Sequence, residues 1–373
     1  MNIQMVDLLG QYEKIKTEID TQIGEVIRST IFVKGGKVTE FEENLRKYLN
    51  VGHVIACGNG TDALQIALMA LGLNEGDEVI TTPFTFVSTL EVLALMKLKP
   101  VLADVDTETF NIRPDLVANC ITDKTKAIIP VHLYGQCADM ESINAIADQH
   151  HLYVIEDACQ ALGTDYIYKN GRIAKAGTIG DIASNSFFPT KNLGAFGDGG
   201  ALFTNNDELA QQMRSIANHG MGKRYYYKQI GMNSRLDGIQ AAILDVKLYY
   251  LDKYVKARQT AAEYYDRELS GIQEISIPAR VSYSTHTFHQ YTIKVHKRRD
   301  ELQKYLHSRD IPSMIYYPLP LHIQEAYHYL GYKKGDFPVS EELSNQVLSL
   351  PMHTELTDDQ LIYITTAIRE FFS

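Results

Sequence analysis

The sequence predicts an α/β protein with two domains: a large domain built on a mostly parallel β-sheet (1–250) and a smaller α+β domain (251–373). Two observations predict this architecture. Over the first two-thirds of the chain, short apolar runs alternate with helical patterns, which is typical of a parallel sheet covered by helices on both faces. A helical period then continues over 234–269 and indicates a long connecting helix into a second unit.

The individual elements follow from local patterns. Each expected strand is a short run rich in Val, Ile, Leu or aromatic residues, and each expected helix spaces its apolar residues three and four positions apart. In the large domain the expected strands are 53–57, 77–82, 99–106, 126–135, 152–158 and 199–206, and the expected helices between them are 63–72, 86–99 and 140–151. In the small domain we expect a strand at 289–295 and helices at 298–309 and 357–372, with 343–353 completing the unit.

Composition and charge exclude several classes of protein. The chain has 373 residues, 45% of them apolar and 22% charged, with a formal net charge of −10. Nucleic-acid and membrane-surface binders need a basic face, so neither partner is expected. The opening MNIQMVDLLGQYEKIK has no basic segment followed by an apolar one, so no signal peptide is expected. The four cysteines form no C-x-x-C pair, which argues against a zinc site or a disulfide framework and favours the cytosol.

A Gly-rich turn, GNGTDA (58–63), follows the first expected strand and leads into a helix. Such a turn presents free N–H groups and the positive end of a helix dipole, which together can bind a phosphate. The same string satisfies the dinucleotide pattern G-x-G-x-x-A, which requires an acidic residue at the end of the next strand. Asp77 and Glu78 stand at the beginning of that strand, before VITT, instead of at its end. The phosphate interpretation is therefore favoured over NAD, with an ordinary tight turn as the structural alternative.

Two further strand ends carry candidate side chains. Phe84 and Phe86 follow the second expected strand, where an aromatic ring could stack on a planar ligand or simply pack in the core. Glu156 and Asp157 end the fifth expected strand. A buried carboxylate is costly unless it meets a cation or strong donors, and a protonated pyridine nitrogen would be such a partner. A helix N-cap is the alternative role for Asp157.

Lys191 is the single charged residue between 182 and 197, in a run that is apolar and rich in Gly. Either it reaches solvent at a turn or it is kept for chemistry. Apolar surroundings lower the pKa of a lysine, and the neutral amine can attack a carbonyl to form a Schiff base. A phosphate cradle, a ring stacker, a pyridinium partner and an imine-forming lysine together indicate pyridoxal phosphate as cofactor.

Seven strings then carry a resemblance to a known family. The chain resembles the pyridoxal-phosphate-dependent aminotransferases of nucleotide-linked keto-sugars, and most closely those that act on UDP-2-acetamido-2-deoxy-3-oxo-glucuronate. The resemblance implies the aspartate aminotransferase fold (fold type I) and covers essentially the whole chain. The strings lie between Gly58 and His322 in family order: NGTDAL, PFTFVST, VHLYGQCADM, VIEDACQALG, SFFPTKNLGAFGDGG, MNSRLDGIQAAIL and YYPLPLH.

The resemblance assigns roles to the residues that face the cofactor ring. Lys191 would form the Schiff base with the cofactor and later move protons between cofactor and substrate. Asp157 would pair with the pyridine nitrogen and keep it protonated. Gln160 would lie against the cofactor near its ring oxygen, and Phe86 would stack on the ring face.

The resemblance also assigns the phosphate site and a partner. Gly60 and Thr61 would offer backbone N–H groups to the phosphate, and the Ser186 hydroxyl would add a donor. Asn233 would reach the phosphate from the neighbouring subunit, which implies a homodimer with shared active sites. On the sugar-nucleotide side the candidates are Arg235, Tyr317 and His322, and an acidic sugar could also meet Lys223, Arg224 and Lys228 in a charged stretch that is otherwise an ordinary solvated loop.

The implied function is transfer of an amino group from an amino acid, expected to be L-glutamate, to the keto carbon at C3 of a nucleotide-linked sugar, for surface polysaccharide or lipopolysaccharide biosynthesis. A related dehydratase carries His where this chain has Lys191, which favours amino transfer. The alternative substrates are a dTDP-3-keto-6-deoxyhexose and a nucleotide-linked 4-keto sugar. Alternatives of another class are an NAD-dependent oxidoreductase and a non-catalytic sensor or regulatory protein on the same fold.

Overall fold

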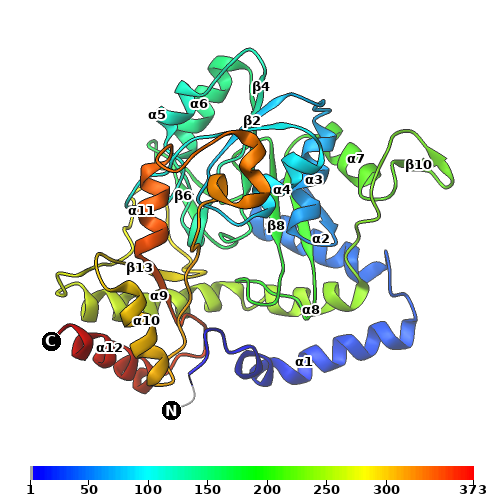
Figure 1. The fold of residues 1–373 in the computed structure, drawn as a ribbon. Helices are drawn as coiled ribbons and strands as arrows, with labels where there is room; N and C mark the ends of the chain where they lie inside the picture. Colours follow the sequence, from blue (N-terminus) through cyan, green and yellow to red (C-terminus); the bar gives the residue numbers. More distant parts are fainter. Residues whose placement is uncertain (1–2) are drawn as a thin grey trace.

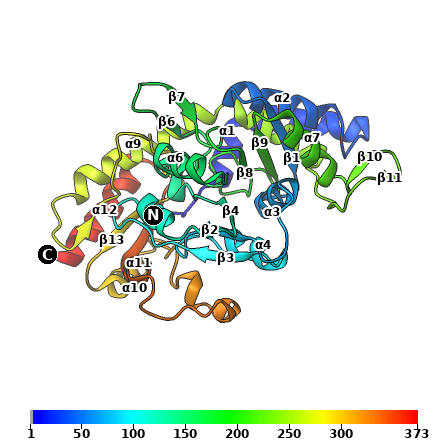
Figure 2. The same ribbon diagram turned by 90° about the horizontal axis from the view of Figure 1, so that it is seen from above.

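The computed structural model describes residues 3–373, and a seven-stranded sheet lies at its centre (Figures 1 and 2). The strand order is β1-β9-β8-β5-β4-β2-β3, and every neighbouring pair is parallel except the two pairs that β9 makes. The predicted α/β class with a mostly parallel sheet is confirmed. The strands are β1 (His53–Cys57), β2 (Glu78–Thr81), β3 (Lys99–Leu102), β4 (Thr125–Ile128), β5 (Tyr153–Asp157), β8 (Ile182–Ser186) and β9 (Gly200–Thr204).

Helices bury both faces of this sheet, as a parallel sheet requires. Side chains alternate along a strand, so Val154 and Ile155 of β5 enter different cores. Ile155 packs with α3, α4 and α7, whereas Val154 packs with α5 and α6. These helices are α3 (Gly60–Ala70), α4 (Ser88–Leu95), α5 (Pro114–Asn119), α6 (Met140–His150) and α7 (Asp207–Ile216).

Further helices pack at the end of the sheet that holds β1 and β9. α2 (Gly36–Leu49) and α8 (Gly238–Leu248) pack together in a core that also holds Phe203 of β9. α1 (Leu8–Ser29) lies beside α8 along the lower side of Figure 1, where Ile19 and Ile243 share a small apolar cluster. Among residues 3–373, no helix is both long and apolar enough to span a membrane.

The small domain is a three-stranded antiparallel sheet with helices against it. α9 (Leu251–Leu269) joins the two parts, because Val255 packs in the large-domain core and Tyr265 in the small-domain core. The division at residue 250 stays a prediction. The elements of this domain are β12 (Ile275–Ser276), β13 (Tyr291–Val295), α10 (Arg299–Ser308), α11 (Pro338–Gln346), β14 (Val347–Leu350) and α12 (Asp358–Phe372).

One sequence expectation was wrong. The helical pattern over 234–269 does not form one helix: α8 ends at Leu248 and α9 begins at Leu251. Neither Gly nor Pro marks the interruption at Tyr249 and Tyr250. Packing explains it, since α8 follows α1 and α2 whereas α9 continues toward α12.

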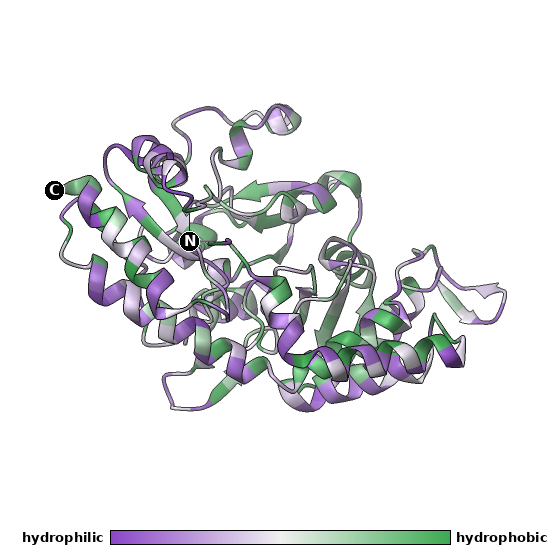
Figure 3. Ribbon diagram, turned by 90° about the horizontal axis from the view of Figure 1, so that it is seen from below, coloured by the Kyte–Doolittle hydropathy of each residue, from purple (hydrophilic) through white to green (hydrophobic). Residues whose placement is uncertain are grey.

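The remaining elements are short, and they include an exposed hairpin as well as buried helical turns. The hairpin of β10 and β11 projects from the body on the same side as α7 (Figures 1 and 2), and it carries the charged stretch with Lys223 and Arg224. Hydropathy colouring shows the central strands as largely apolar and the outer helices as banded (Figure 3). These short elements are η1 (Leu133–Gly135), β6 (Asp165–Ile167), β7 (Ile173–Lys175), β10 (Met221–Lys223), β11 (Tyr226–Tyr227), η2 (Leu321–Ile323) and η3 (Glu325–Leu330).

Candidate active site

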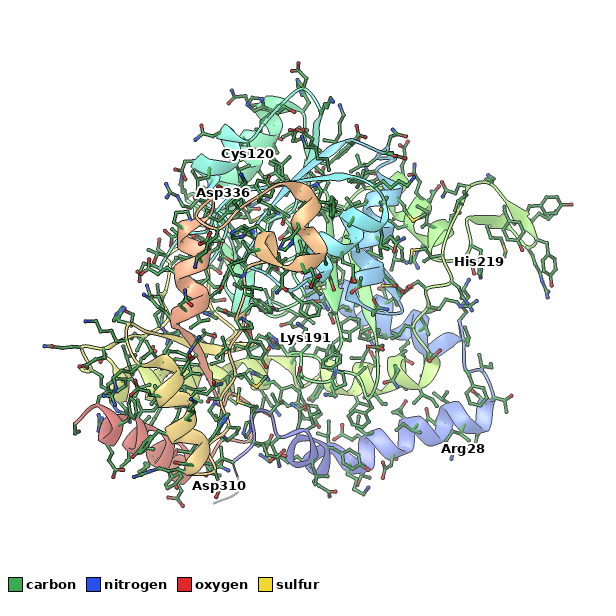
Figure 4. All side chains as sticks on the ribbon, viewed as in Figure 1. Arg28, Cys120, Lys191, His219, Asp310 and Asp336 are labelled. Carbon is green, nitrogen blue, oxygen red and sulfur yellow. The ribbon has the colours of Figure 1, made fainter. Side chains whose placement is uncertain are left out.

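A cavity of about 850 Å³ opens where β1, β5 and β8 end, between the large domain and the segment 316–324. Ligands collect at the carboxyl ends of strands in open α/β sheets, so the position is the expected one. Figure 4 shows Lys191 near the middle of the molecule, close to the α8–α9 layer. Eight of the residues predicted from the sequence line the cavity: Gly60, Thr61, Phe86, Asp157, Gln160, Ser186, Tyr317 and Lys191.

Lys191 lies in a tight segment that follows β8. Its own N–H donates to the carbonyl of Phe188 at 2.8 Å, which closes a turn and turns the side chain into the cavity wall. Burial lowers the pKa of its ammonium below the ordinary value, an effect that Cys159 and Asp157 oppose. The amine is thereby brought toward the neutral form that attacks carbonyls.

Asp157 ends β5 and is 6% exposed. One carboxylate oxygen accepts from the Thr89 hydroxyl at 3.0 Å, and the other accepts from the Cys159 N–H at 3.3 Å. Among residues 3–373, no Lys, Arg or His forms an ion pair with it. A buried carboxylate with two neutral donors and no cation suits a protonated ring nitrogen.

Its neighbour Glu156 points to the other face of β5 and binds backbone and His donors there. This fully buried carboxylate accepts from His132 Nε2 at 2.8 Å and from the backbone N–H groups of Gly177, Ile179 and Gly180 at 2.9, 2.6 and 2.7 Å. Glu156 is therefore structural, and of the two strand-end carboxylates only Asp157 reaches the cavity.

The predicted phosphate cradle lies at the start of α3. The Asn59 side chain caps this helix by accepting from the N–H of Asp62 at 2.8 Å, which leaves the N–H groups of Gly60 and Thr61 directed beyond the helix end. A Cβ on Gly60 would lie 2.8 Å from Ser186 Cβ, so helix and strand end meet with no room for a side chain. Free N–H groups, a helix dipole and a nearby hydroxyl are groups that suit an anion.

Aromatic and amide groups form the opposite wall. Phe86 is 55% exposed at the cavity although it is a large aromatic residue, and its ring centroid lies 6.4 Å from that of Tyr317. Gln160 connects two elements: its Nε2 donates to the Tyr317 hydroxyl at 3.2 Å, and its Oε1 accepts from the Tyr134 N–H at 2.7 Å. Phe86 is thus placed to stack on a ring, and Gln160 is fixed beside that position.

Six residues that the sequence suggested for the phosphate or the sugar do not line the cavity of the single chain: Lys223, Arg224, Lys228, Asn233, Arg235 and His322. Asn233 and Arg235 lie on the segment before α8, where Asn233 is exposed and bridges to Asn218, and Arg235 is half-buried. His322 is fully buried, and its Nε2 lies 3.0 Å from Glu341 Oε1. Any role of these residues toward the substrate stays a prediction.

Other cavity residues were not anticipated from the sequence. His289 and Gln290 precede β13 and line the cavity from the small domain. A buried atom of each, His289 Nδ1 and Gln290 Oε1, has no hydrogen-bond partner among residues 3–373. Thr89 of α4 does not line the cavity itself, but its hydroxyl donates to the carboxylate of Asp157, which does. Their only sequence signal is position near a strand or helix end, which many polar residues share.

The donor set fits pyridoxal phosphate. A lysine with a lowered pKa, a buried carboxylate without a cation, an exposed aromatic ring and a helix N-terminus too tight for a Cβ meet in one cavity. Each group has a counterpart in the cofactor: the aldehyde, the ring nitrogen, the ring face and the phosphate.

Comparison with known proteins gives the same result. The model of the DegT/DnrJ/EryC1/StrS aminotransferase family matches residues 13–369. A relative from Geobacillus stearothermophilus, described as a pleiotropic regulatory protein, is 50% identical over 100% of this chain and 99% of its own length. The UDP-2-acetamido-2-deoxy-3-oxo-D-glucuronate aminotransferase of Pseudomonas aeruginosa is 43% identical over 98% of this chain and 99% of its own length.

A solved structure is similar throughout. The crystal structure of S. venezuelae DesV in complex with a ketimine intermediate superposes with a TM-score of 0.96 at 35% identity, covering 100% of this chain and 99% of that one. The fold and the cofactor expected from the sequence are confirmed, and the chain belongs to the DegT/DnrJ/EryC1/StrS family of pyridoxal-phosphate-dependent sugar aminotransferases.

Proposed function

We propose that this enzyme transfers the amino group of L-glutamate to the keto carbon at C3 of a nucleotide-linked sugar such as UDP-2-acetamido-2-deoxy-3-oxo-glucuronate, for surface polysaccharide or lipopolysaccharide biosynthesis. The observation that carries the proposal is the meeting of Lys191 and Asp157 in one cavity with the start of α3. The relative from Pseudomonas aeruginosa supports the choice of sugar. A dTDP-3-keto-6-deoxyhexose and a nucleotide-linked 4-keto sugar are the alternative substrates.

The chain's own residues supply binding and proton transfer. When bound, pyridoxal phosphate supplies an aldehyde that exchanges amino groups and a ring that withdraws electrons. The first turn of α3 and Ser186 hold the phosphate, and Asp157 keeps a proton on the ring nitrogen. The amine of Lys191 takes a proton from the substrate carbon in one half-reaction and returns one in the other.

The relative described as a regulatory protein does not favour a non-catalytic role here. A sensor has no need of an amine with a lowered pKa or of a buried carboxylate without a cation, and this chain keeps both. The cytosol is the proposed location, because all four cysteines are free thiols.

Absorbance spectroscopy tests the proposal. The protein loaded with pyridoxal phosphate should show the visible band of the lysine-bound cofactor. L-Glutamate should remove this band, and the correct keto-sugar nucleotide should restore it. Lys191→Ala is the control and should show no lysine-bound band. A wild-type protein that stays colourless with the cofactor would overturn the proposed chemistry, and restoration by dTDP-linked sugars alone would overturn the proposed substrate.

We also propose a homodimer with shared active sites, and the charge of the cavity supports it. Within residues 3–373, Lys191 is the one Lys or Arg in the lining, whereas the acids are Asp62, Asp157 and Asp198. Glutamate and a nucleoside diphosphate are both anions, so further cations have to come from outside the single-chain cavity.

A second copy of the chain could supply these cations from the surface around Arg235. Arg235 lies near Lys34, whose pKa is lowered by burial and by the charge of Arg235. Beside them Ile31, Phe32 and Val33 are exposed apolar residues. Cations that form no ion pair within residues 3–373, next to an exposed apolar strip, support a contact with another subunit.

Mixed dimers test this arrangement. Asn233→Ala and Lys191→Ala homodimers should each be impaired, and mixing them should restore activity, because one site then combines an intact Lys191 with an intact Asn233 from the other subunit. Asn345→Ala, an exposed Asn on α11, is the control and should behave like wild type. Mixtures that remain as inactive as the homodimers would mean that Asn233 acts within its own subunit or not at all.

A further inference from the structure

The segment that holds Lys191 is a closed loop with little freedom. The Phe187 N–H donates to Gly199 at 2.7 Å, and the Ala195 N–H donates to Phe187 at 2.8 Å, which joins the two ends of the loop. Inside it, a Cβ on Gly194 would lie 2.1 Å from the carbonyl oxygen of Pro189. The backbone of the loop folds back on itself at Gly194 so closely that no side chain fits there.

The carbonyl of Gly194 meets a buried cation. Lys247 lies on α8, is 2% exposed, and its Nζ donates to the carbonyl oxygen of Gly194 at 2.5 Å. The Phe196 ring centroid lies 5.6 Å from the same Nζ, so the ammonium also faces an aromatic ring. Among residues 3–373, no carboxylate forms an ion pair with Lys247.

A buried lysine without an acidic partner is costly, so its presence calls for a reason. Burial, and after it the charge of Arg258, lowers the pKa of Lys247 to about 8. A Leu or Met would fill the same space without that cost, but it would leave the Gly194 carbonyl buried with no donor. The lysine is therefore explained by the loop that it binds rather than by the core in which it lies.

We propose that Lys247 is a positioning residue for Lys191: its ammonium holds the Gly194 carbonyl, fixes the loop 187–195 and so sets where the Lys191 amine stands. Arg258 is not an equivalent, because its guanidinium donates to the carbonyls of Phe288, His289 and Met352, outside that loop. This inference rests on the proposed role of Lys191 as the residue that binds the cofactor.

The test compares two buried lysines. Lys247→Met removes the ammonium and nearly keeps the volume. Lys294→Met is the matched control, since Lys294 is also buried but donates to Thr107 and Glu108, away from the loop. The measurements are the dissociation constant for pyridoxal phosphate, the pH midpoint of the lysine-bound absorbance band, and the unfolding temperature of the cofactor-free protein.

We expect Lys247→Met to weaken cofactor binding about tenfold, the effect of losing a charged hydrogen bond, and to shift the pH midpoint of the band. Lys294→Met should lower the unfolding temperature but leave both cofactor measurements as in wild type. Lys247→Gln, neutral but polar, is the second variant and should act in the same direction if Lys247→Met does not fold. If Lys247 variants lower only the unfolding temperature, the inference is overturned. A wild-type protein that never binds the cofactor would instead overturn the proposed function.

Discussion

Replacing Gly60 with Ala tests the geometry of the phosphate cradle most directly. Gly60 is the first residue of α3, and its N–H is one of the groups assigned to the phosphate. An added Cβ would lie 2.8 Å from Ser186 Cβ and 3.0 Å from Cys159 Sγ, both closer than non-bonded atoms normally approach. Either the first turn of α3 or the end of β8 then has to move.

The size of the effect follows from two opposing terms. Overpacking a tight site costs about 1–3 kcal/mol, and replacing Gly by Ala recovers about 0.4–1 kcal/mol from the unfolded chain. The net loss of stability is therefore between about 0 and 2.6 kcal/mol. Displacing one N–H from a charged phosphate removes a further hydrogen bond worth roughly 1.5–3 kcal/mol, so cofactor binding should weaken about tenfold to a hundredfold.

Gly36→Ala is a closely matched control. Gly36 is likewise the first residue of a helix, α2, but a Cβ there meets no atom within 4 Å. The control should keep its cofactor affinity and gain up to about 1 kcal/mol. Thermal unfolding of the cofactor-free protein and titration with pyridoxal phosphate measure both effects. If Gly60→Ala behaves like Gly36→Ala in both assays, α3 and β8 do not meet as the structure shows, and the cradle is wrong.

Two further predictions concern charge. Asp157→Asn should keep the fold, because an amide can still form hydrogen bonds with Thr89 and with the Cys159 N–H. The turnover rate should fall about tenfold to a hundredfold, since a hydrogen bond to a charged group is worth roughly 1.5–3 kcal/mol. An unimpaired steady-state rate would contradict the pairing of Asp157 with the ring nitrogen. Burial, and after it the charge of Arg280, lowers the pKa of His286 from 6.5 to about 3, so unfolding takes up a proton and stability should fall as the pH drops from 6.5 toward 3. Denaturant titrations across this range give the free energy of unfolding at each pH. In His286→Asn this free energy should change with pH less steeply than in wild type, by about 1.4 kcal/mol per pH unit. An unchanged slope would contradict the assigned pKa of His286.

The sequence predicts most of the sheet but misses one central strand. β1 is predicted at both ends, because HVIAC is a clear apolar run. β8 is missed, because most side chains of Ile182–Ser186 are small or polar and do not give the apolar pattern of a buried strand. Asn185 in this strand is nevertheless fully buried. This strand forms through its neighbours β5 and β9 rather than through its own propensity.

The candidate site divides in the same way. Lys191 and Asp157 could be predicted because charge in an apolar run or at a buried strand end is unusual and needs a chemical reason. His289 and Gln290 could not, because they reach the cavity from a different domain, and nothing local distinguishes them from other polar residues. The break between α8 and α9 was missed for a related reason: apolar periodicity shows which face is buried but not against which partner.

The one reversed strand, β9, has a consequence for how the enzyme can change. Gly200 begins β9 between Cys57 and Ser186, and a Cβ on it would lie 2.3 Å from the carbonyl oxygen of Asn59. No side chain fits at this end of β9, which lies against the residue that caps α3, whereas the cavity is lined by side chains such as Tyr316 and Gln324. A side chain at Gly200 would therefore displace the start of α3, whereas new side chains in the cavity lining can change substrate preference without moving that helix. Directed evolution toward another sugar can therefore change the lining side chains and leave the start of α3 unaltered.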